Sequence, residues 1–198
     1  MNLRIFQFIP STNVEGPGTR ACIQVQGCPI HCPGCAVPQT WPFKRGTIVS
    51  AMDIANQIIN GPPVEGVTFL GGEPFAQAAA LAQIGAHLKD QGMSVVAFTG
   101  YPIEDIQAAN RQDYNALLAV TDLLIDGPFQ EENIDFSRPW VGSRNQRFHF
   151  LTDRYADLSQ RINTIPNKIE VRMRPDGRIL INGMAAPDEM RALIRGSA

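Results

Sequence analysis

The sequence predicts an α/β fold in which a parallel β-sheet is covered by helices. Through the middle of the chain, short apolar runs of strand length alternate with longer segments in which apolar residues recur at helical spacing. Continuously apolar strands are typical of parallel sheets, which are buried on both faces. The residues with chemical character follow the ends of these runs, where parallel sheets place their ligands.

The elements of this repeat can be taken in chain order. Segment 21–26 alternates apolar and polar residues and is expected to be a strand. Ser50 and Asp53 form a capping-box pattern that begins a helix, which buries Ile54, Ile58 and Ile59 and ends at Gly61. The pattern then predicts a strand over 67–70, a helix over 76–91, a strand over 95–99, a broken helical stretch through Tyr114, Leu117 and Leu118, and a strand over 123–126.

The C-terminal part of the chain has a different pattern. Residues 168–174 alternate, Pro175, Asp176 and Gly177 form a turn sequence, and residues 178–181 return, which predicts a β-hairpin. A last helix is expected over 187–195, with acidic residues at its start and a glycine beyond its end. Because 198 residues suit one domain and no linker interrupts them, we expect a single domain over 1–198, with 151–198 as a C-terminal extension packed on it.

Three cysteines on one short loop form the most informative motif. Three residues separate Cys28 from Cys32, and two separate Cys32 from Cys35. Three thiolates at this spacing can hold three corners of a four-iron cluster and leave one iron open to another ligand, whereas structural clusters normally use four cysteines. Zinc is the alternative, although it prefers four tetrahedral ligands and His31 is poorly placed to be the fourth. Cys22 lies in the alternating segment 21–26 and is expected in the core.

A second motif, Gly71-Gly72-Glu73-Pro74, directly follows the apolar run 67–70. Two glycines let the backbone approach a ligand closely, and a carboxylate can pair with an ammonium group. The alternative is a plain strand-to-helix turn in which Glu73 favours the start of the helix. On its own this motif is a weak signal, and its position downstream of the cysteine loop is what gives it meaning.

Composition narrows the class of protein. The chain is 44% hydrophobic and 18% charged, which is ordinary for a globular protein, and its net charge of −2 without a Lys/Arg run argues against nucleic-acid binding. The first ten residues are too short and too mixed for a signal peptide, and no apolar run reaches membrane-spanning length. Because thiols that bind iron need a reducing compartment, we expect a cytoplasmic protein.

With both motifs in place, the chain resembles the radical S-adenosylmethionine family, whose defining loop has this cysteine spacing. Within that family it is similar to the activating proteins of anaerobic (class III) ribonucleotide reductase. The similarity covers roughly residues 8–150 and rests on separated motifs in the same order. Besides the cysteine loop and the double glycine, these are Glu15 to Arg20, Gly27-Cys28, Trp41, Thr99-Gly100-Tyr101, Asp126 to Phe129 and Gly142 to Arg147.

The resemblance implies a fold, two cofactors and a partner. The fold would be a partial (β/α) barrel with a C-terminal hairpin and helix. Cys28, Cys32 and Cys35 would hold a 4Fe-4S cluster, with no catalytic residue beyond these ligands, and the cluster would cleave S-adenosylmethionine to a 5′-deoxyadenosyl radical. The partner would be a glycyl-radical enzyme such as anaerobic ribonucleoside-triphosphate reductase, with flavodoxin or ferredoxin as electron donor. The cofactor-binding residues would be Gly34, Cys35, Ala36, Gly71, Gly72, Glu73, Thr99 and Asp126.

Some residues leave alternatives open. Ala36 stands where many activating proteins have an aromatic residue, and Pro128 replaces a frequent lysine. Ala36 and the extension 151–198 motivate a second hypothesis, a radical enzyme that modifies a small molecule or a peptide. A noncatalytic iron–sulfur or zinc module is a third. Asp126 is equally well explained as a helix or turn cap, and Arg144 and Arg147 either dock a partner or only solvate a loop.

Overall fold

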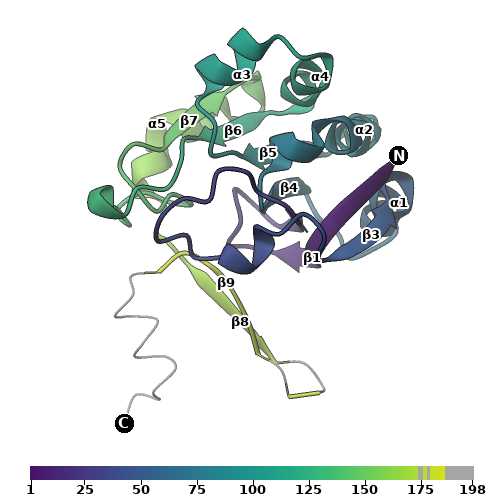
Figure 1. The fold of residues 1–198 in the computed structure, drawn as a ribbon, viewed down its shortest axis with the longest axis horizontal. Coiled ribbons are helices and arrows are strands. Elements are labelled where there is room, and N and C mark those ends of the chain that lie inside the picture. Colours follow the sequence, from purple (N-terminus) through teal and green to yellow (C-terminus); the bar gives the residue numbers. More distant parts are fainter. Residues whose placement is uncertain (174–175, 178, 186–198) are drawn as a thin grey trace.

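A seven-stranded sheet with the strand order β3-β1-β2-β4-β5-β6-β7 organises the chain (Figure 1). The computed structural model describes residues 1–173, 176–177 and 179–185. Strands β2, β4, β5 and β6 are parallel to one another, whereas β1, β3 and β7 join them antiparallel. The strands of this sheet are β1 (Asn2–Thr12), β2 (Arg20–Val25), β3 (Thr47–Ser50), β4 (Gly66–Gly71), β5 (Ser94–Phe98), β6 (Leu123–Asp126) and β7 (Arg147–Phe150).

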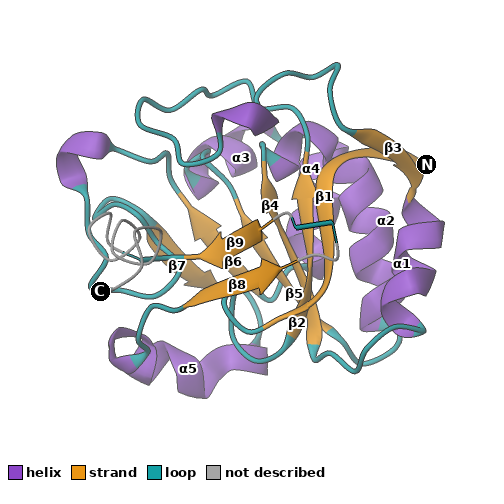
Figure 2. Cartoon of the chain, turned by 90° about the horizontal axis from the view of Figure 1, so that it is seen from below, coloured by secondary structure: helices purple, strands orange, loops and turns teal. Residues whose placement is uncertain are grey.

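Helices cover both faces of the sheet and produce two apolar cores. Figure 2 shows α1 (Ala51–Ile59), α2 (Ala78–Lys89) and α4 (Gln112–Val120) on one side of the strands and α5 (Ala156–Arg161) on the other. The larger core lies under the first group, where Leu81, Ile84 and Leu88 of α2 are fully buried. A smaller core packs Leu158 of α5 against β5 and β6. The α/β class and its parallel strands are therefore confirmed.

The predicted helix starts and stops agree with the structure. The Ser50 hydroxyl accepts a hydrogen bond of 3.3 Å from the backbone N–H of Asp53 and caps α1, as the capping-box pattern predicts. A short 3-10 turn over Pro74–Gln77 precedes α2. The broken helical stretch is two helices, α3 (Ile103–Ala109) and α4, which are separated at Asn110 with a positive φ of 43°.

The local sequence pattern predicts no strand at Asn2–Thr12 or Thr47–Ser50, although β1 and β3 complete one side of the sheet. Polar residues and Pro10 interrupt the apolar pattern of β1, and the strand also contains two register shifts. Pro10 is tolerated because β3 pairs only with residues Asn2 to Ile5 of β1, so the missing N–H of Pro10 faces no partner strand on that side. The pairing of β1 is thus set by tertiary contacts rather than by local periodicity.

The predicted C-terminal hairpin is present as β8 (Ile169–Met173) and β9 (Ile179–Gly183), which extend away from the body in Figure 1. Polar contacts tie the hairpin to the end of β1. Glu170 Oε2 accepts from Thr12 Oγ1 at 2.5 Å, and Asn182 Nδ2 donates to the same hydroxyl oxygen at 3.0 Å. The predicted helix over 187–195 lies outside the described residues. None of the described helices is long and apolar enough to cross a membrane.

Candidate active site

The motifs predicted to carry chemistry meet at one edge of the sheet. The cysteine loop follows β2, Gly71 to Glu73 follow β4, Thr99 follows β5 and Asp126 ends β6. Because these neighbouring strands are parallel, their carboxyl ends lie side by side. A cavity of about 200 Å³ opens there. Its lining includes Cys28, Cys32, Cys35, Gly71, Gly72, Glu73 and Thr99, and also Ile30, Trp41, Gly100, Gly127, Phe129 and Gln146.

The cysteine loop is fixed to its neighbours at its entry. The N–H groups of Gly27 and Cys28 donate to the carbonyl oxygens of Thr40 and Trp41 at 2.7 and 3.0 Å. Cys28 is buried, Cys32 and Cys35 are half-buried, and all three are free thiols. Burial raises the pKa of the Cys28 and Cys32 thiols, so binding of iron must displace their protons. Cys22 is fully buried within β2, which confirms its place in the core.

The three thiols have the chemistry that a four-iron cluster needs. All three line one cavity. Cysteine thiolates are the ligands of iron–sulfur clusters, whereas a structural zinc ion takes four ligands. The donor set is therefore compatible with a cluster that has three cysteine ligands.

Glu73 is a buried carboxylate that pairs with no basic side chain among the described residues. Only 1% of it is exposed, and its oxygens accept hydrogen bonds from the N–H of Phe75 at 2.8 Å, Thr99 Oγ1 at 2.8 Å and the N–H of Gly100 at 2.9 Å. Burial raises the pKa of Glu73 to about 7, because these three donors compensate only part of the lost hydration. Neutral donors hold the carboxylate at the cavity wall, and its charge remains available to a ligand.

The double glycine joins the two motifs. Gly71 has a φ of +108°, a conformation that side chains disfavour. A Cβ at Gly72 would lie 2.3 Å from the carbonyl oxygen of Gly27, the residue before the first ligand cysteine. The same carbonyl oxygen accepts from the N–H of Glu73 at 2.9 Å. Any side chain at Gly72 would therefore push the carboxylate segment away from the cysteine loop.

Asp126 differs from the other predicted contacts because its carboxylate is used inside the fold. It accepts from the N–H of Ile103 at 2.7 Å and from Arg147 at 2.6 and 3.0 Å, and His149 Nε2 lies 3.0 Å away. Burial alone would raise the pKa of Asp126, but these donors bring it below its usual value. Asp126 does not line the cavity and instead caps the start of α3, which agrees with the alternative of a helix cap. Gly34 and Ala36 are exposed and are also absent from the lining.

Arg20 and Arg147, which end two of the motifs shared with the resembled family, form hydrogen bonds and ion pairs within the fold. Arg20 is fully buried at the start of β2, opposite the cavity, and donates to Thr68 Oγ1, Tyr155 Oη and the carbonyl of Val67 at 2.6 to 2.8 Å. Arg147 pairs with Glu104 and Asp126. Of the two arginines for which partner docking or a solvated loop was expected, Arg147 thus pairs with this chain's own carboxylates, whereas Arg144 is exposed and both alternatives stay open for it.

Sequence reasoning gave Gln146 and Phe129 no role at the site. Gln146 Oε1 accepts from the N–H of Gly142 at 2.8 Å, and its Nε2 donates to the carbonyl of Gly127 at 3.3 Å. It thereby fixes two loops around the cavity. The ring of Phe129 packs against the backbone of Gly34. The signal was that both residues lie in motifs shared with the resembled family, but only the fold shows which side chains face the cavity.

The chain is similar in sequence to several known proteins. Residues 14–149 match the family model described as a 4Fe-4S single cluster domain. The chain is 31% identical over 159 residues to the anaerobic ribonucleoside-triphosphate reductase-activating protein of Salmonella typhi, covering 75% of this chain and 99% of that protein. The protein of the same name from Enterobacteria phage T4 is 29% identical over 151 residues, covering 73% and 92%. The crystal structure of QueE from Escherichia coli aligns with a TM-score of 0.40 and 21% identity over 50% of this chain and 53% of that one, too little to equate the two folds.

Proposed function

We propose a function for this chain from its family, because the chain belongs to the anaerobic ribonucleoside-triphosphate reductase-activating proteins. In this proposal it cleaves S-adenosylmethionine reductively. The cleavage generates a glycyl radical on such a reductase. In this proposal Cys28, Cys32 and Cys35 hold a 4Fe-4S cluster at the carboxyl ends of the parallel strands. Strands β2, β4, β5 and β6 would form the partial barrel of the radical S-adenosylmethionine type.

The observation that carries the proposal is the buried carboxylate of Glu73 beside the three thiols. A structural iron–sulfur or zinc module has no use for it, and a buried carboxylate without a cation destabilises the fold. Here it faces the same cavity as the cysteines and is held by neutral donors. An amino group bound at this position would supply the missing N–H donors, and the methionine part of S-adenosylmethionine carries such a group.

Each group around the cavity then has a defined task. When bound and reduced, the cluster would supply one electron to the sulfonium, whose 5′ carbon–sulfur bond breaks to give methionine and a 5′-deoxyadenosyl radical. Glu73 would bind the amino group, and Thr99 would orient Glu73 through their 2.8 Å hydrogen bond. Gly71 and Gly72 would allow close approach of the ligand. The side chains of Ile30, Trp41 and Phe129 would exclude water from the radical.

The radical acceptor is proposed to be a glycine of the partner reductase. Such a residue must reach the 5′ carbon itself, because hydrogen abstraction requires contact. The cavity is not enclosed, so a loop of a second protein could enter it. A one-electron donor such as flavodoxin or ferredoxin would reduce the cluster, and this oxygen-sensitive chemistry suits the cytoplasm.

The test is radical transfer to the partner. The cluster-loaded protein, reduced without oxygen and supplied with S-adenosylmethionine and the anaerobic reductase of the same organism, should produce a glycine-centred doublet in electron paramagnetic resonance. If the reductase carries deuterated glycine, deuterium should appear in 5′-deoxyadenosine. Cofactor cleavage without either signal would instead favour a small molecule or a peptide as the substrate.

A further inference from the structure

The segment that follows the cysteine loop carries basic side chains and no acidic ones. Residues 21–52 contain no Asp or Glu but include Lys44 and Arg45, although the whole chain has a net charge of −2. Both side chains are exposed, and neither is hydrogen-bonded or ion-paired among the described residues. Arg4 adds a third cation, because its Nη1 donates to the carbonyl oxygen of Arg45 at 3.2 Å. We call residues 41–48 together with Arg4 the basic rim.

Aromatic contacts connect the basic rim directly to the first cluster ligand. The ring of Phe43 lies against Gly27, where a Cβ would be 2.6 Å from it, yet 51% of Phe43 is exposed. The carbonyl of Trp41 accepts from the N–H of Cys28 at 3.0 Å. The ring of Trp41 also stacks on His31, with centroids 4.6 Å apart. An exposed aromatic surface therefore contacts the backbone that carries Cys28.

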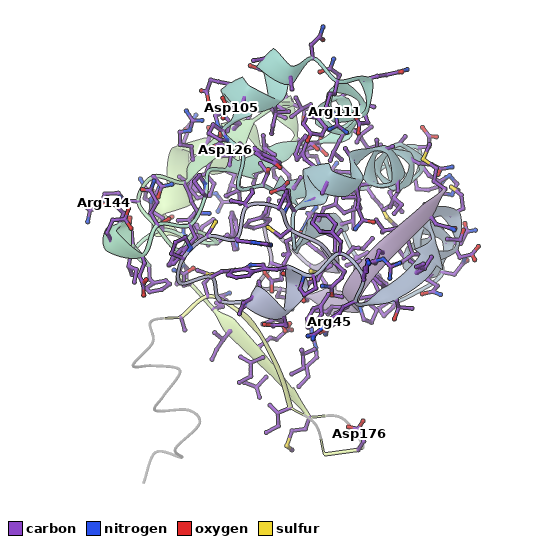
Figure 3. All side chains as sticks on the ribbon, in the orientation of Figure 1. Arg45, Asp105, Arg111, Asp126, Arg144 and Asp176 are labelled. Atoms are coloured by element: carbon purple, nitrogen blue, oxygen red, sulfur yellow. The ribbon has the colours of Figure 1, made fainter. Side chains whose placement is uncertain are left out.

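The other side of the cysteine loop is less basic. Glu131 and Glu132 form a short turn there, and the Glu131 carboxylate lies close to Gly34. The exposed Arg144 lies beside this turn, since its backbone N–H donates to the carbonyl oxygen of Asn133 at 2.8 Å, and it offsets one of the two acidic charges. An acidic protein is thus attracted more strongly to the basic rim than to the Glu131 side. Phe43, Lys44 and Arg45 do not line the cavity, so they are not required to hold a cofactor in it. Figure 3 shows Arg45 well apart from Arg144, the exposed arginine of the loop before β7.

We propose that the basic rim is the docking surface for an acidic one-electron donor protein that reduces the cluster. This inference rests on the proposed function, since it assigns the route by which the electron enters the same site. The donor loses one electron and the cluster gains it, with no bond formed or broken. Electron tunnelling slows steeply with distance. Because Trp41 of the rim accepts a hydrogen bond from the Cys28 backbone, a donor bound here is close to the cluster. Its acidic surface is steered by Lys44 and Arg45.

Charge reversal at the rim tests this assignment. The double variant Lys44→Glu/Arg45→Glu changes two exposed side chains that have no partner in the part of the chain that the structure describes, so the fold is expected to persist. Arg154→Glu is the control for charge reversal at another exposed position, because Arg154 is also exposed but lies before α5. Flavodoxin, a small acidic flavoprotein, is the probe. The first readout is its binding to each cluster-loaded protein in the oxidised state, and the second is the rate at which reduced flavodoxin bleaches the cluster absorption.

We expect the double variant to bind flavodoxin at least about tenfold more weakly than the parent at an ionic strength of about 0.05 M, with a matching loss in bleaching rate. The difference should shrink at about 0.5 M, where charges are screened over a few ångströms. Arg154→Glu should behave as the parent does. Equal binding by parent and double variant, or an equal loss in the Arg154→Glu control, would overturn the inference.

Reduction by dithionite separates this inference from the proposed function. Dithionite needs no docking surface, so the double variant reduced by it should cleave S-adenosylmethionine and form the glycyl radical as well as the parent. If radical transfer fails in the dithionite-reduced variant alone, the rim binds the reductase and the donor assignment is wrong. If the dithionite-reduced parent cleaves no cofactor, the proposed function fails, whereas the flavodoxin binding result is unaffected.

Discussion

Replacing Glu73 by glutamine is predicted to weaken S-adenosylmethionine binding most strongly at alkaline pH. Burial raises the pKa of Glu73 to about 7. The carboxylate is therefore about nine-tenths ionised at pH 8 and about one-tenth ionised at pH 6, roughly a tenfold change in the form that attracts the amino group. At pH 8 the variant also loses a charge-assisted hydrogen bond worth about 1.5–3 kcal/mol, which corresponds to about 10- to 150-fold in affinity.

The assay is anaerobic calorimetric titration of S-adenosylmethionine into cluster-loaded parent and variant protein between pH 6 and 8.5. The informative quantity is the dissociation constant of the variant divided by that of the parent. Titration of the cofactor's own amino group affects both constants equally and cancels in this ratio. The ratio should fall about tenfold from pH 8 to pH 6, as the parent loses its charge. A ratio that stays constant with pH, or parent-like affinity in the variant, would refute the role assigned to Glu73.

The same raised pKa predicts that the iron-free protein becomes less stable to unfolding as pH rises. Below the ordinary carboxyl value of 4.5, Glu73 is protonated in both the folded and the unfolded states, so it has no effect. As pH rises from 4.5 to about 7, the unfolded chain releases a proton that the folded chain retains, and stability falls. The cost is complete above pH 7 and amounts to about 3 kcal/mol. Glu73→Gln lacks this loss in urea unfolding, and parallel pH profiles would contradict the burial argument.

Three further substitutions test the rest of the site. Cys28→Ser should abolish the visible absorption and the sulfide content of the reconstituted cluster, whereas Cys22→Ser should keep both; equal loss in the two variants would show that Cys22 is a ligand. Gly72→Ala should lower cluster occupancy and cofactor affinity together, because its Cβ would meet the Gly27 carbonyl at 2.3 Å, and normal values of both would show that the loops can move apart. Arg20→Met should destabilise the fold by at least about 3 kcal/mol in chemical denaturation, because several buried acceptors lose their donor, while an unchanged midpoint would remove its structural role.

The sequence alone predicts those parts of the fold whose local pattern and tertiary role agree. The strands β4, β5 and β6 are short, mostly apolar and largely buried, and Ser50 caps α1 through the N–H of Asp53, three residues further along. The three cysteines are found from spacing because they lie on one loop. The strand β1 has no comparable pattern, because its register depends on pairing with β2 and β3.

Side-chain direction is the part of the site that spacing does not reveal. Glu73 and Asp126 both follow buried parallel strands, yet only Glu73 lines the cavity. The difference arises because Arg147 and His149, on the antiparallel strand β7, meet Asp126, whereas no basic side chain among the described residues pairs with Glu73. A pairing across 21 residues of sequence is set by the sheet and has no local signature.

The central claim is that the cysteine loop and Glu73 together bind and cleave S-adenosylmethionine. The most direct measurement is chromatographic quantification of the products after the cluster-loaded protein is reduced by dithionite without oxygen and incubated with the cofactor alone. We expect methionine and 5′-deoxyadenosine in equal amounts, with much less of both from Glu73→Gln at the same cluster content. An intact, reducible cluster that yields no 5′-deoxyadenosine would contradict it.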